Sequence, residues 1–279
     1  TQSPSSAASD VYKRQEGGFI IKIDKPTGDG ESCSTCYDDS FSFSSRYDTN
    51  GDISDQSNIF FIYHYPKPDD ISQDQKDYIQ SVIFEFESVL LSENNEELLN
   101  LIDLQSFIDF FIINELSKNP DGYRLSTFLN KDFNGKLKMG PIWDFNLAYA
   151  NVDYCDGANP VGWIYNFNSI CPDDIWQVPF WWEDLMQKEV FKTALKNRWF
   201  SLRSSSLSNS TILNTIDSYT ENLKSNKITD QNFYVWPVLG QYIWPNFFVG
   251  STHEEEIEFL KSWIDDRLDW MDMEINSLN

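Results

Sequence analysis

The pattern of apolar and polar positions in the first quarter of the chain is typical of β-strands. Residues 17–24 (GGFIIKID) are apolar and β-branched after two glycines, and residues 41–51 and 58–66 continue with short apolar or alternating runs. Asn50-Gly51 supplies a turn signal between these runs. We therefore expect a small β-rich segment that ends near residue 68.

From about residue 72 the spacing changes to that of helices. Four apolar residues share one helix face at i, i+4, i+7 and i+11, namely Ile79, Ile83, Phe86 and Leu90. Asp103 is expected to cap a second helix that ends near Lys118. Further helices are expected over residues 181–203 and 211–224. A last helix opens with a capping box at Thr252–Glu255, in which each side chain binds a free backbone N–H.

Residues 126–144 interrupt the helical pattern and predict a β-hairpin. Asn134-Gly135 stands between two apolar runs, which is a strong signal for a tight hairpin turn. The return strand is expected to lead into Asp144. Residues 151–180 are aromatic and loop-like, so the chain as a whole is expected to be α+β.

The charge and composition of the chain argue against some classes of binding partner. The chain has 279 residues, 16% aromatic residues and a formal net charge of −23. Such an acidic chain is a poor candidate for binding nucleic acid or an anionic membrane, because both attract positive surfaces. We see no apolar stretch of the roughly 18 residues that a transmembrane helix requires.

The first fifteen residues do not read as natural protein. Residues 5–15 (SSAASDVYKRQ) match the translation of a transposon adaptor that is common in sequencing libraries. Residues 1–15 are therefore interpreted as a non-native segment that does not contribute to the fold. The expectation is that the natural protein begins upstream of Glu16 and that this chain is a fragment.

The four cysteines predict local disulfides. Cys33 and Cys36 form a C-x-x-C pair in a polar loop, whereas a zinc site would need a second such pair or nearby histidines. Disulfides 33–36 and 155–171 are expected, and free thiols remain the alternative. Disulfides would suit an exported protein.

One set of polar residues has the types and the order expected of a phosphoryl-transfer site. Asp121 lies in a polar loop after a helix, Ser126 follows five positions later, and a hairpin then leads to Asp144-Phe145-Asn146. Phosphoryl transfer needs a carboxylate that orients the acceptor and Mg²⁺ that neutralises phosphate charge. Because Mg²⁺ binds through one or two carboxylates and keeps several waters, few protein ligands suffice. The order of these residues matches that of protein kinases.

Residues 107–151 resemble the core of the CotH family of atypical kinases. The matching features are NELSKNPDGY, the hairpin, and GPIWDFNLAYAN. Residues 78–90, 181–199 and 263–272 resemble other helices of the family, and the resemblance covers residues 16–279 at varying strength.

The resemblance implies a protein-kinase-like α+β fold. Residues 16–68 would be a remnant of the β-rich N-terminal lobe, and residues 69–279 a mostly helical C-terminal lobe with an embedded β-hairpin. It also implies ATP and Mg²⁺ as cofactors and a protein Ser or Thr hydroxyl as acceptor. The identity of the acceptor protein and the oligomeric state are left open.

The resemblance assigns roles around the polar loop. Asp121 would be the catalytic aspartate. Asn119 would shape the loop or contact phosphate or metal, although it could equally cap the preceding helix. Ser126 would lie on the nucleotide side, or would be an ordinary hydroxyl at the start of a strand.

The same resemblance assigns the metal. Asp144 would be the principal Mg²⁺ ligand, and Asn146 stands where the family usually has a second aspartate, so weaker metal binding is expected. Asp24 takes the acidic place that follows the first strand, on the cofactor side. The lysine that grips the nucleotide is expected upstream of this chain, which alone should bind ATP poorly.

Other residues are given structural interpretations. Trp143 and Phe145 are expected to pack in the core. Glu87 is expected to be buried and paired with an arginine such as Arg198 or Arg267, because an unpaired buried carboxylate is driven toward its neutral form.

The two histidines are not expected to take part in chemistry. His64 is expected to be half-buried on a strand, and His253 to be exposed at the start of a helix. The second hypothesis for function is a non-catalytic exported surface or scaffold protein that keeps the kinase-like fold.

Overall fold

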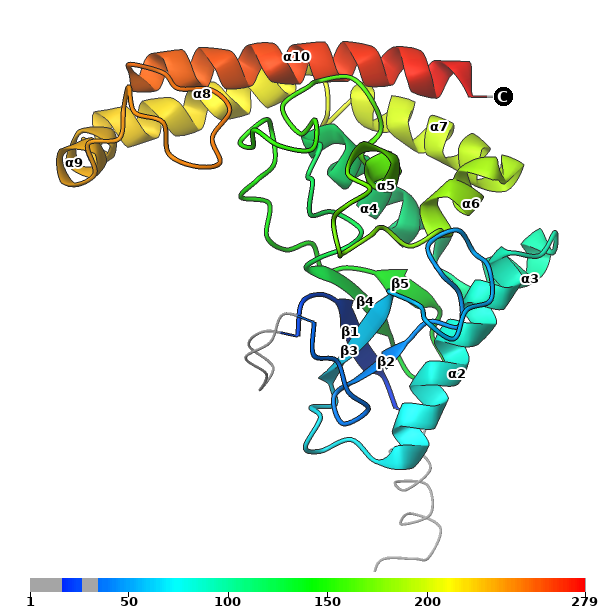
Figure 1. The fold of residues 1–279 in the computed structure, drawn as a ribbon. Coiled ribbons are helices and arrows are strands. Elements are labelled where there is room, and N and C mark those ends of the chain that lie inside the picture. The colour runs from blue at the N-terminus through cyan, green and yellow to red at the C-terminus, as the bar shows by residue number, and fades with distance from the viewer. Residues whose placement is uncertain (1–16, 27–34, 279) are drawn as a thin grey trace, which may run out of the picture. The chain divides into compact units, whose positions relative to one another are not determined.

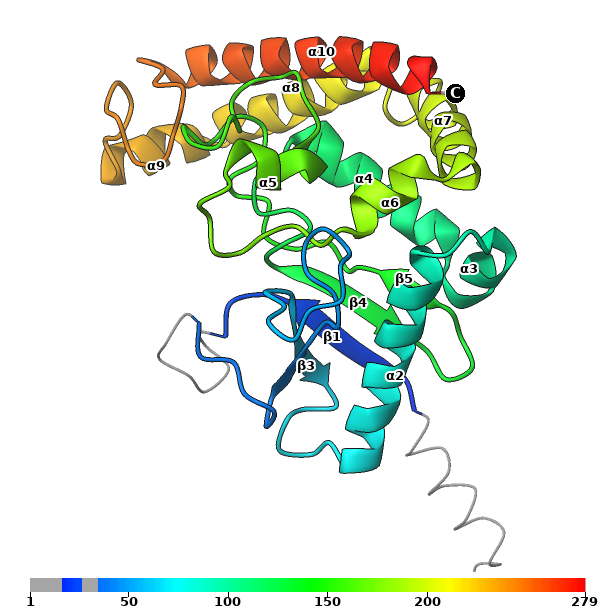
Figure 2. The same ribbon diagram turned by 45° about the vertical axis from the view of Figure 1, so that its right-hand side comes forward.

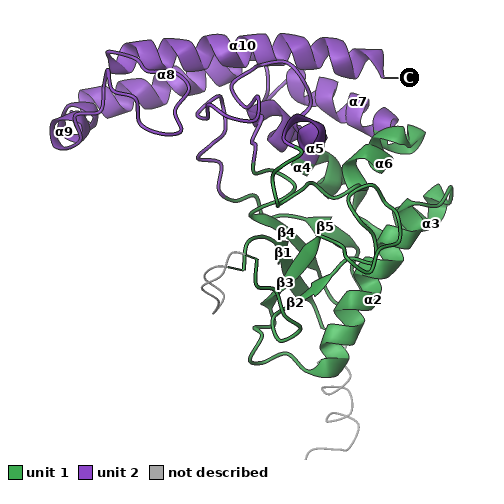
Figure 3. Ribbon diagram, viewed as in Figure 1, with its two compact units in different colours: residues 1–110, 121–143, 172–191 green, residues 111–120, 144–171, 192–279 purple. Residues whose placement is uncertain are grey.

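The computed structural model describes residues 17–26 and 35–278, which fall into two compact units (Figure 3). Unit 1 contains the chain up to Phe110 together with residues 121–143 and 172–191, and unit 2 contains residues 111–120, 144–171 and 192–279. The expected division into an N-terminal lobe (residues 16–68) and a C-terminal lobe (residues 69–279) stays a prediction. The adaptor-like residues 1–15 lie outside the described residues.

Unit 1 is built on a five-stranded antiparallel sheet in the order β2-β3-β1-β4-β5 (Figure 1). Its strands are β1 (Phe19–Ile23), β2 (Ser42–Ser44), β3 (Phe60–Tyr65), β4 (Thr127–Lys131) and β5 (Leu137–Met139). The expected early strands and the hairpin β4–β5 are confirmed. The hairpin is not embedded in a helical part, however, because Ile21 on β1 pairs with both Tyr63 on β3 and Leu129 on β4.

Unit 1 also contains helices, one of which runs alongside the sheet (Figure 2). They are α2 (Gln73–Leu90), α3 (Asn95–Leu101), the first half of α4 (Leu104–Ser117) and α6 (Trp181–Gln187). The expected apolar face of α2 is confirmed, since Ile79, Ile83, Phe86 and Leu90 are all buried. Asp103 caps α4 by accepting from the backbone N–H of Ser106 at 3.1 Å, as expected. The short helix α3 was not expected.

Unit 2 is mostly helical. Its elements are η1 (Ile164–Asn166), α5 (Phe167–Ile170), most of α7 (Glu189–Arg203), α8 (Asn209–Ser225), α9 (Ile228–Val235) and α10 (His253–Ser277). The helix expected over residues 181–203 is divided, because Lys188 is extended and separates α6 from α7. Helices α8 and α10 run side by side (Figures 1 and 2), and Lys261 pairs with Asp217 across them.

The capping box of α10 is displaced by one residue. Thr252 Oγ1 accepts from the N–H of Glu255 at 3.2 Å, as expected, but the Glu255 carboxylate accepts from the N–H of Ser251. His253 begins the helix but is half-buried rather than exposed. His64 is half-buried on β3, as expected. None of the helices among the described residues is long and apolar enough to cross a membrane.

Glu87 is buried, but the expected arginine partner is wrong. Its carboxylate accepts from Ser45 Oγ at 2.9 Å and from Trp181 Nε1 at 3.1 Å. Arg267 instead pairs with Glu115, in unit 2. Burial raises the pKa of Glu87 to about 7, because the hydrogen bonds from Ser45 and Trp181 and the charge of Arg46 offset only part of the desolvation.

Glu87→Gln is expected to remove a pH dependence of stability. The folded pKa lies above the ordinary value of 4.5, so the contribution of Glu87 is fully present below that value and is lost as pH rises to about 7. Its size is on the order of 3 kcal/mol. Urea unfolding of wild type and Glu87→Gln at pH 4.5 and 8 measures it. A stability difference between the two proteins that is the same at both pH values would contradict the assignment.

Candidate functional site

The residues expected at the site fall in both units. Asp24, Asp121 and Ser126 belong to unit 1, and Asn119, Asp144 and Asn146 belong to unit 2.

Strand register brings Asp24 and Ser126 to the same end of the sheet. Ile23 on β1 lies opposite Thr127 on β4, and Asp24 and Ser126 are the next residues beyond this pair. The Asp24 carboxylate accepts from Lys22 Nζ at 3.3 Å and from the N–H of Lys25 at 2.9 Å. Asp24 is thus held in place by neighbours on its own segment.

Asp121 is held by an arginine that the sequence analysis did not single out. Arg124 is buried and donates from Nη2 to Asp121 Oδ1 at 2.9 Å and from Nη1 to Asp174 Oδ1 at 3.1 Å. One guanidinium therefore bridges two partly exposed carboxylates. The signal in the sequence is the i, i+3 spacing of Asp121 and Arg124 in a tight loop.

The loop is anchored in the core of unit 1 by Tyr123. This side chain is buried and packs against Trp182, with ring centroids 4.5 Å apart. Its φ of 71° turns the backbone sharply, and the N–H of Leu125 bonds the Asp121 carbonyl at 3.0 Å. The carboxylate of Asp121 is thus presented from a hydrogen-bonded turn that is packed against the core of unit 1.

In unit 2, Asn119 ends helix α4 through its backbone. Its N–H bonds the Asn114 carbonyl at 3.2 Å, and the N–H of Lys118 bonds the Glu115 carbonyl at 3.1 Å. Lys118 has a φ of 44°, so the helix ends in a Schellman motif with lysine where glycine is usual. Asn119 itself is buried. The structural role of Asn119 at the helix end is therefore present, and a catalytic role stays a prediction.

Asp144 and Asn146 lie on an exposed turn rather than at the end of a strand. Strand β5 ends at Met139, so the expected delivery of Asp144 by the return strand is wrong by five residues. Asp144 has a φ of 63°, a conformation that aspartate adopts more readily than most residues. The N–H of Tyr149 bonds the Ser117 carbonyl at 2.7 Å, which ties this turn to the end of α4.

The expected core packing of Trp143 is also wrong. Trp143 is 65% exposed, and Phe145 is half-buried. The reason is that the chain leaves the sheet at Gly140, whose φ of 110° few other residues adopt. The aromatic residues around Asp144 therefore flank an exposed acid instead of filling a core.

The oxygen atoms of Asp144 and Asn146 can bind Mg²⁺, but they are too few to fill its coordination sphere without other ligands. Asp144 and Asn146 both expose hard oxygen atoms, which suit Mg²⁺. Within residues 17–26 and 35–278, no three His, Cys, Asp or Glu side chains gather to hold a metal ion. A bound ion would take its remaining ligands from phosphate and water, as is usual for Mg²⁺ in phosphoryl-transfer sites.

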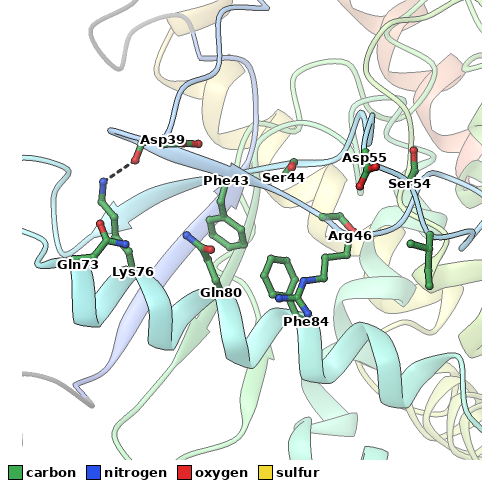
Figure 4. Close-up of a pocket in the computed structure, with 12 residues that line it drawn as sticks. Asp39, Phe43, Ser44, Arg46, Ser54, Asp55, Gln73, Lys76, Gln80 and Phe84 are labelled. Carbon is green, nitrogen blue, oxygen red and sulfur yellow. Dashed lines mark hydrogen bonds between the residues drawn. The ribbon is translucent and has the colours of Figure 1, made fainter.

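One cavity in each unit is relevant to the search for a site. In unit 1, a polar cavity of about 650 Å³ lies between β2 and α2, where Arg46 stacks on Phe84 at 4.0 Å and Lys76 donates to the Asp39 carbonyl (Figure 4). None of the expected site residues lines it. In unit 2, a cavity of about 320 Å³ is lined by Asn146 and others.

The disulfide between Cys155 and Cys171 is confirmed, with Cα atoms 5.6 Å apart. Cys36 is disulfide-bonded as well. Cys33 lies outside the described residues, so the 33–36 pairing stays a prediction.

The loop holding Asp121, the β4–β5 hairpin and the exposed Asp144 follow one another in the order of a kinase-like protein. The chain belongs to the CotH kinase protein family, whose family model matches residues 10–271. A search of curated proteins finds no match to the chain.

Proposed function

We propose that the intact parent protein transfers the γ-phosphate of ATP to a Ser or Thr hydroxyl of an acceptor protein. Membership of the CotH kinase family supports phosphoryl transfer and a protein substrate. The observation that carries the proposal is the fixed orientation of the Asp121 carboxylate, which the buried Arg124 holds at 2.9 Å. A carboxylate fixed in this way can orient an acceptor hydroxyl and take its proton.

The metal side of the proposal rests on unit 2. Asp144 and Asn146 would hold Mg²⁺, which supplies neutralisation of phosphate charge when bound. The hydrogen bond between Tyr149 and Ser117 supports a fixed position for this turn relative to Asn119. Asp24 and Ser126, at one end of the sheet, are proposed to lie on the nucleotide side.

Asn146→Asp is expected to raise the affinity of the intact protein for Mg²⁺ by about tenfold, because a carboxylate adds a full charge beside a divalent cation. Titration of Mg²⁺ in the presence of a non-hydrolysable ATP analogue measures the change. Asp153→Asn, an acid on the same unit outside this turn, serves as the control and should leave affinity within about twofold. No gain for Asn146→Asp would exclude a role for position 146 as a metal ligand.

The second candidate function is a non-catalytic exported surface or scaffold protein. The amide at Asn146 favours it, because the family usually has an acid there. We propose export in either case, and the Cys155–Cys171 disulfide supports this since disulfides persist in oxidising compartments.

A radiolabelled ATP transfer assay on the intact protein separates the two functions. The wild type is expected to label an acceptor, and Asp144→Ala to reduce labelling to background. The present chain alone is expected to bind Mg-ATP more weakly than micromolar. Absence of both nucleotide binding and labelling in the intact protein would favour the scaffold, and micromolar binding by the chain alone would contradict the expectation of weak binding.

A further inference from the structure

Three charged side chains are fully buried in unit 2 beside the end of α4. Glu115, Lys118 and Arg267 each have no exposed surface. Arg267 Nη2 lies 3.2 Å from Glu115 Oε2, so two of the three form an ion pair. Charges removed from water are stable only where close hydrogen bonds replace their hydration. The groups that form those hydrogen bonds therefore stabilise this cluster.

A single loop, residues 156–165, supplies many of them. The Glu115 carboxylate accepts from the N–H groups of Ile164 and Tyr165 at 2.8 and 2.9 Å. Because both donors are adjacent backbone groups, they meet the two carboxylate oxygens only when this part of the loop keeps its shape.

The same loop turns its carbonyl groups to the two cations. Lys118 Nζ donates to the carbonyls of Asn159 and Val161 at 2.8 and 2.6 Å, and also pairs with Asp156 at 3.2 Å. Arg267 Nη1 donates to the carbonyls of Pro160 and Gly162, both at 2.8 Å. The backbone groups of the loop thus supply hydrogen bonds that water would otherwise give to these three charged side chains.

The Cys155–Cys171 disulfide closes this loop. The two cysteines are 16 positions apart in sequence, and Cys155 immediately precedes the loop. Cys155 and Asp156 both have positive φ, at 49° and 57°, a backbone shape that few non-glycine residues adopt without support. A crosslink at this point restricts the alternative conformations of the loop.

The cluster is joined to the candidate site through Lys118. This residue has the left-handed conformation that ends α4, and Asn119, Pro120 and Asp121 follow it directly. We call residues 119–121 the catalytic segment. The side-chain hydrogen bonds of Lys118 to the loop hold the residue that immediately precedes this segment. The neighbouring Ser117 carbonyl holds Tyr149, on the turn that carries Asp144.

We propose that the Cys155–Cys171 disulfide is a redox control on the position of the catalytic segment, acting through the loop 156–165 and Lys118. Its effect on activity rests on the proposed function. The reductant is a dithiol. One of its thiolates attacks a cysteine sulfur, which breaks the S–S bond, releases the other cysteine and forms a mixed disulfide; its second thiol then attacks its own sulfur in that mixed disulfide and releases the remaining cysteine. Two cysteine thiols and an oxidised dithiol result, with two electrons and two protons transferred. Lys118 is thereby a positioning residue.

Hydrogen exchange of this chain tests the structural part without any activity. In a Cys33→Ser/Cys36→Ser background, dithiothreitol should raise amide exchange in peptides containing Ile164 and Tyr165 by about 100-fold. Peptides from α8 should not change, and reoxidation should restore protection. Unchanged exchange at residues 164–165 after complete reduction would overturn the proposal. Equal loss of protection in α8 would also overturn it, because the disulfide would then be a general staple.

A second pair of variants separates positioning from general stability. Lys118→Gly keeps the backbone turn, because glycine favours positive φ, but removes the bonds to the loop. It should reproduce the exchange pattern of the reduced protein even when oxidised. Lys118→Arg keeps a charged donor and should retain most of the protection. Wild-type exchange in oxidised Lys118→Gly would contradict the role of Lys118.

The intact protein tests the consequence for catalysis. Reduction should lower kcat by at least about tenfold while KM for ATP changes little, because the catalytic segment moves and the nucleotide contacts do not. A change in KM for ATP with no change in kcat would contradict a positioning role. Absence of transfer in both redox states would refute the proposed function, and hydrogen exchange would still decide whether the disulfide controls the loop.

Discussion

Replacing Arg267 by methionine is expected to lower the free energy of unfolding by about 3–5 kcal/mol, because removal of one partner leaves a buried charge uncompensated. Methionine fills a similar volume but donates no hydrogen bond. The Glu115 carboxylate would keep the two backbone N–H donors of the loop and lose the guanidinium that lies 3.2 Å away. The carbonyls of Pro160 and Gly162 would lose a donor as well.

An exposed ion pair provides the matched control. Lys138 and Asp132 lie 3.2 Å apart, with side chains 37% and 78% exposed. Lys138→Met should cost no more than about 1 kcal/mol, because solvent screens such pairs. Urea unfolding followed by tryptophan fluorescence measures both variants.

A double variant isolates the cause of the loss. Adding Glu115→Gln to Arg267→Met removes the orphaned charge and should recover part of the lost stability, since the amide oxygen can still accept from the loop. If Arg267→Met cost no more than Lys138→Met, the buried pair would not be a determinant of stability. If the double variant were less stable than the single one, the charge of Glu115 would not be the cause.

Features set by neighbours in the sequence were predictable. The apolar face of α2, the cap at Asp103 and the β4–β5 hairpin each depend on residues a few positions apart, and each is confirmed. The Cys155–Cys171 disulfide is confirmed too, although its pairing depended on choosing the local combination. Local spacing is sufficient in these cases because the interacting groups lie within one element or one loop.

Features that join distant segments were not predictable. The pairing of β1 with β4 connects residues about a hundred positions apart, so no local pattern shows that the hairpin extends the first sheet. For Glu87 the sequence indicated a buried carboxylate in need of partners. Its donors proved to be Ser45 and Trp181, because tertiary packing decides which side chains reach a buried group.

The candidate site shows the same division. Motif order pointed to Asp121 and Asp144, whereas the residues that hold these segments were missed. Arg124 bridges Asp121 to Asp174, fifty positions further along, and Lys118 is bound by a loop some forty positions away. Motifs preserve groups that act on a ligand, while the supporting contacts come from wherever the fold brings a donor or acceptor.

Asp121→Asn is expected to lower kcat of the intact protein by about 10²–10⁴-fold, the usual contribution of a positioned general base. Asparagine has the same shape and keeps an oxygen that can accept from Arg124 Nη2, so the loop should stay folded. It cannot take the proton of the acceptor hydroxyl. KM for ATP should change little, because Asp121 is proposed to act on the acceptor rather than on the nucleotide.

Asp174→Asn is the matched control for this variant. Asp174 accepts from the same guanidinium at 3.1 Å, so each substitution removes one carboxylate charge beside Arg124. A loss of kcat confined to Asp121→Asn would therefore identify Asp121 as the base. Equal losses in both variants would mean that the bridge through Arg124 supports the loop and that Asp121 has no separate chemical role. Full activity of Asp121→Asn would refute the assignment of the base, because asparagine cannot take the proton of the acceptor hydroxyl.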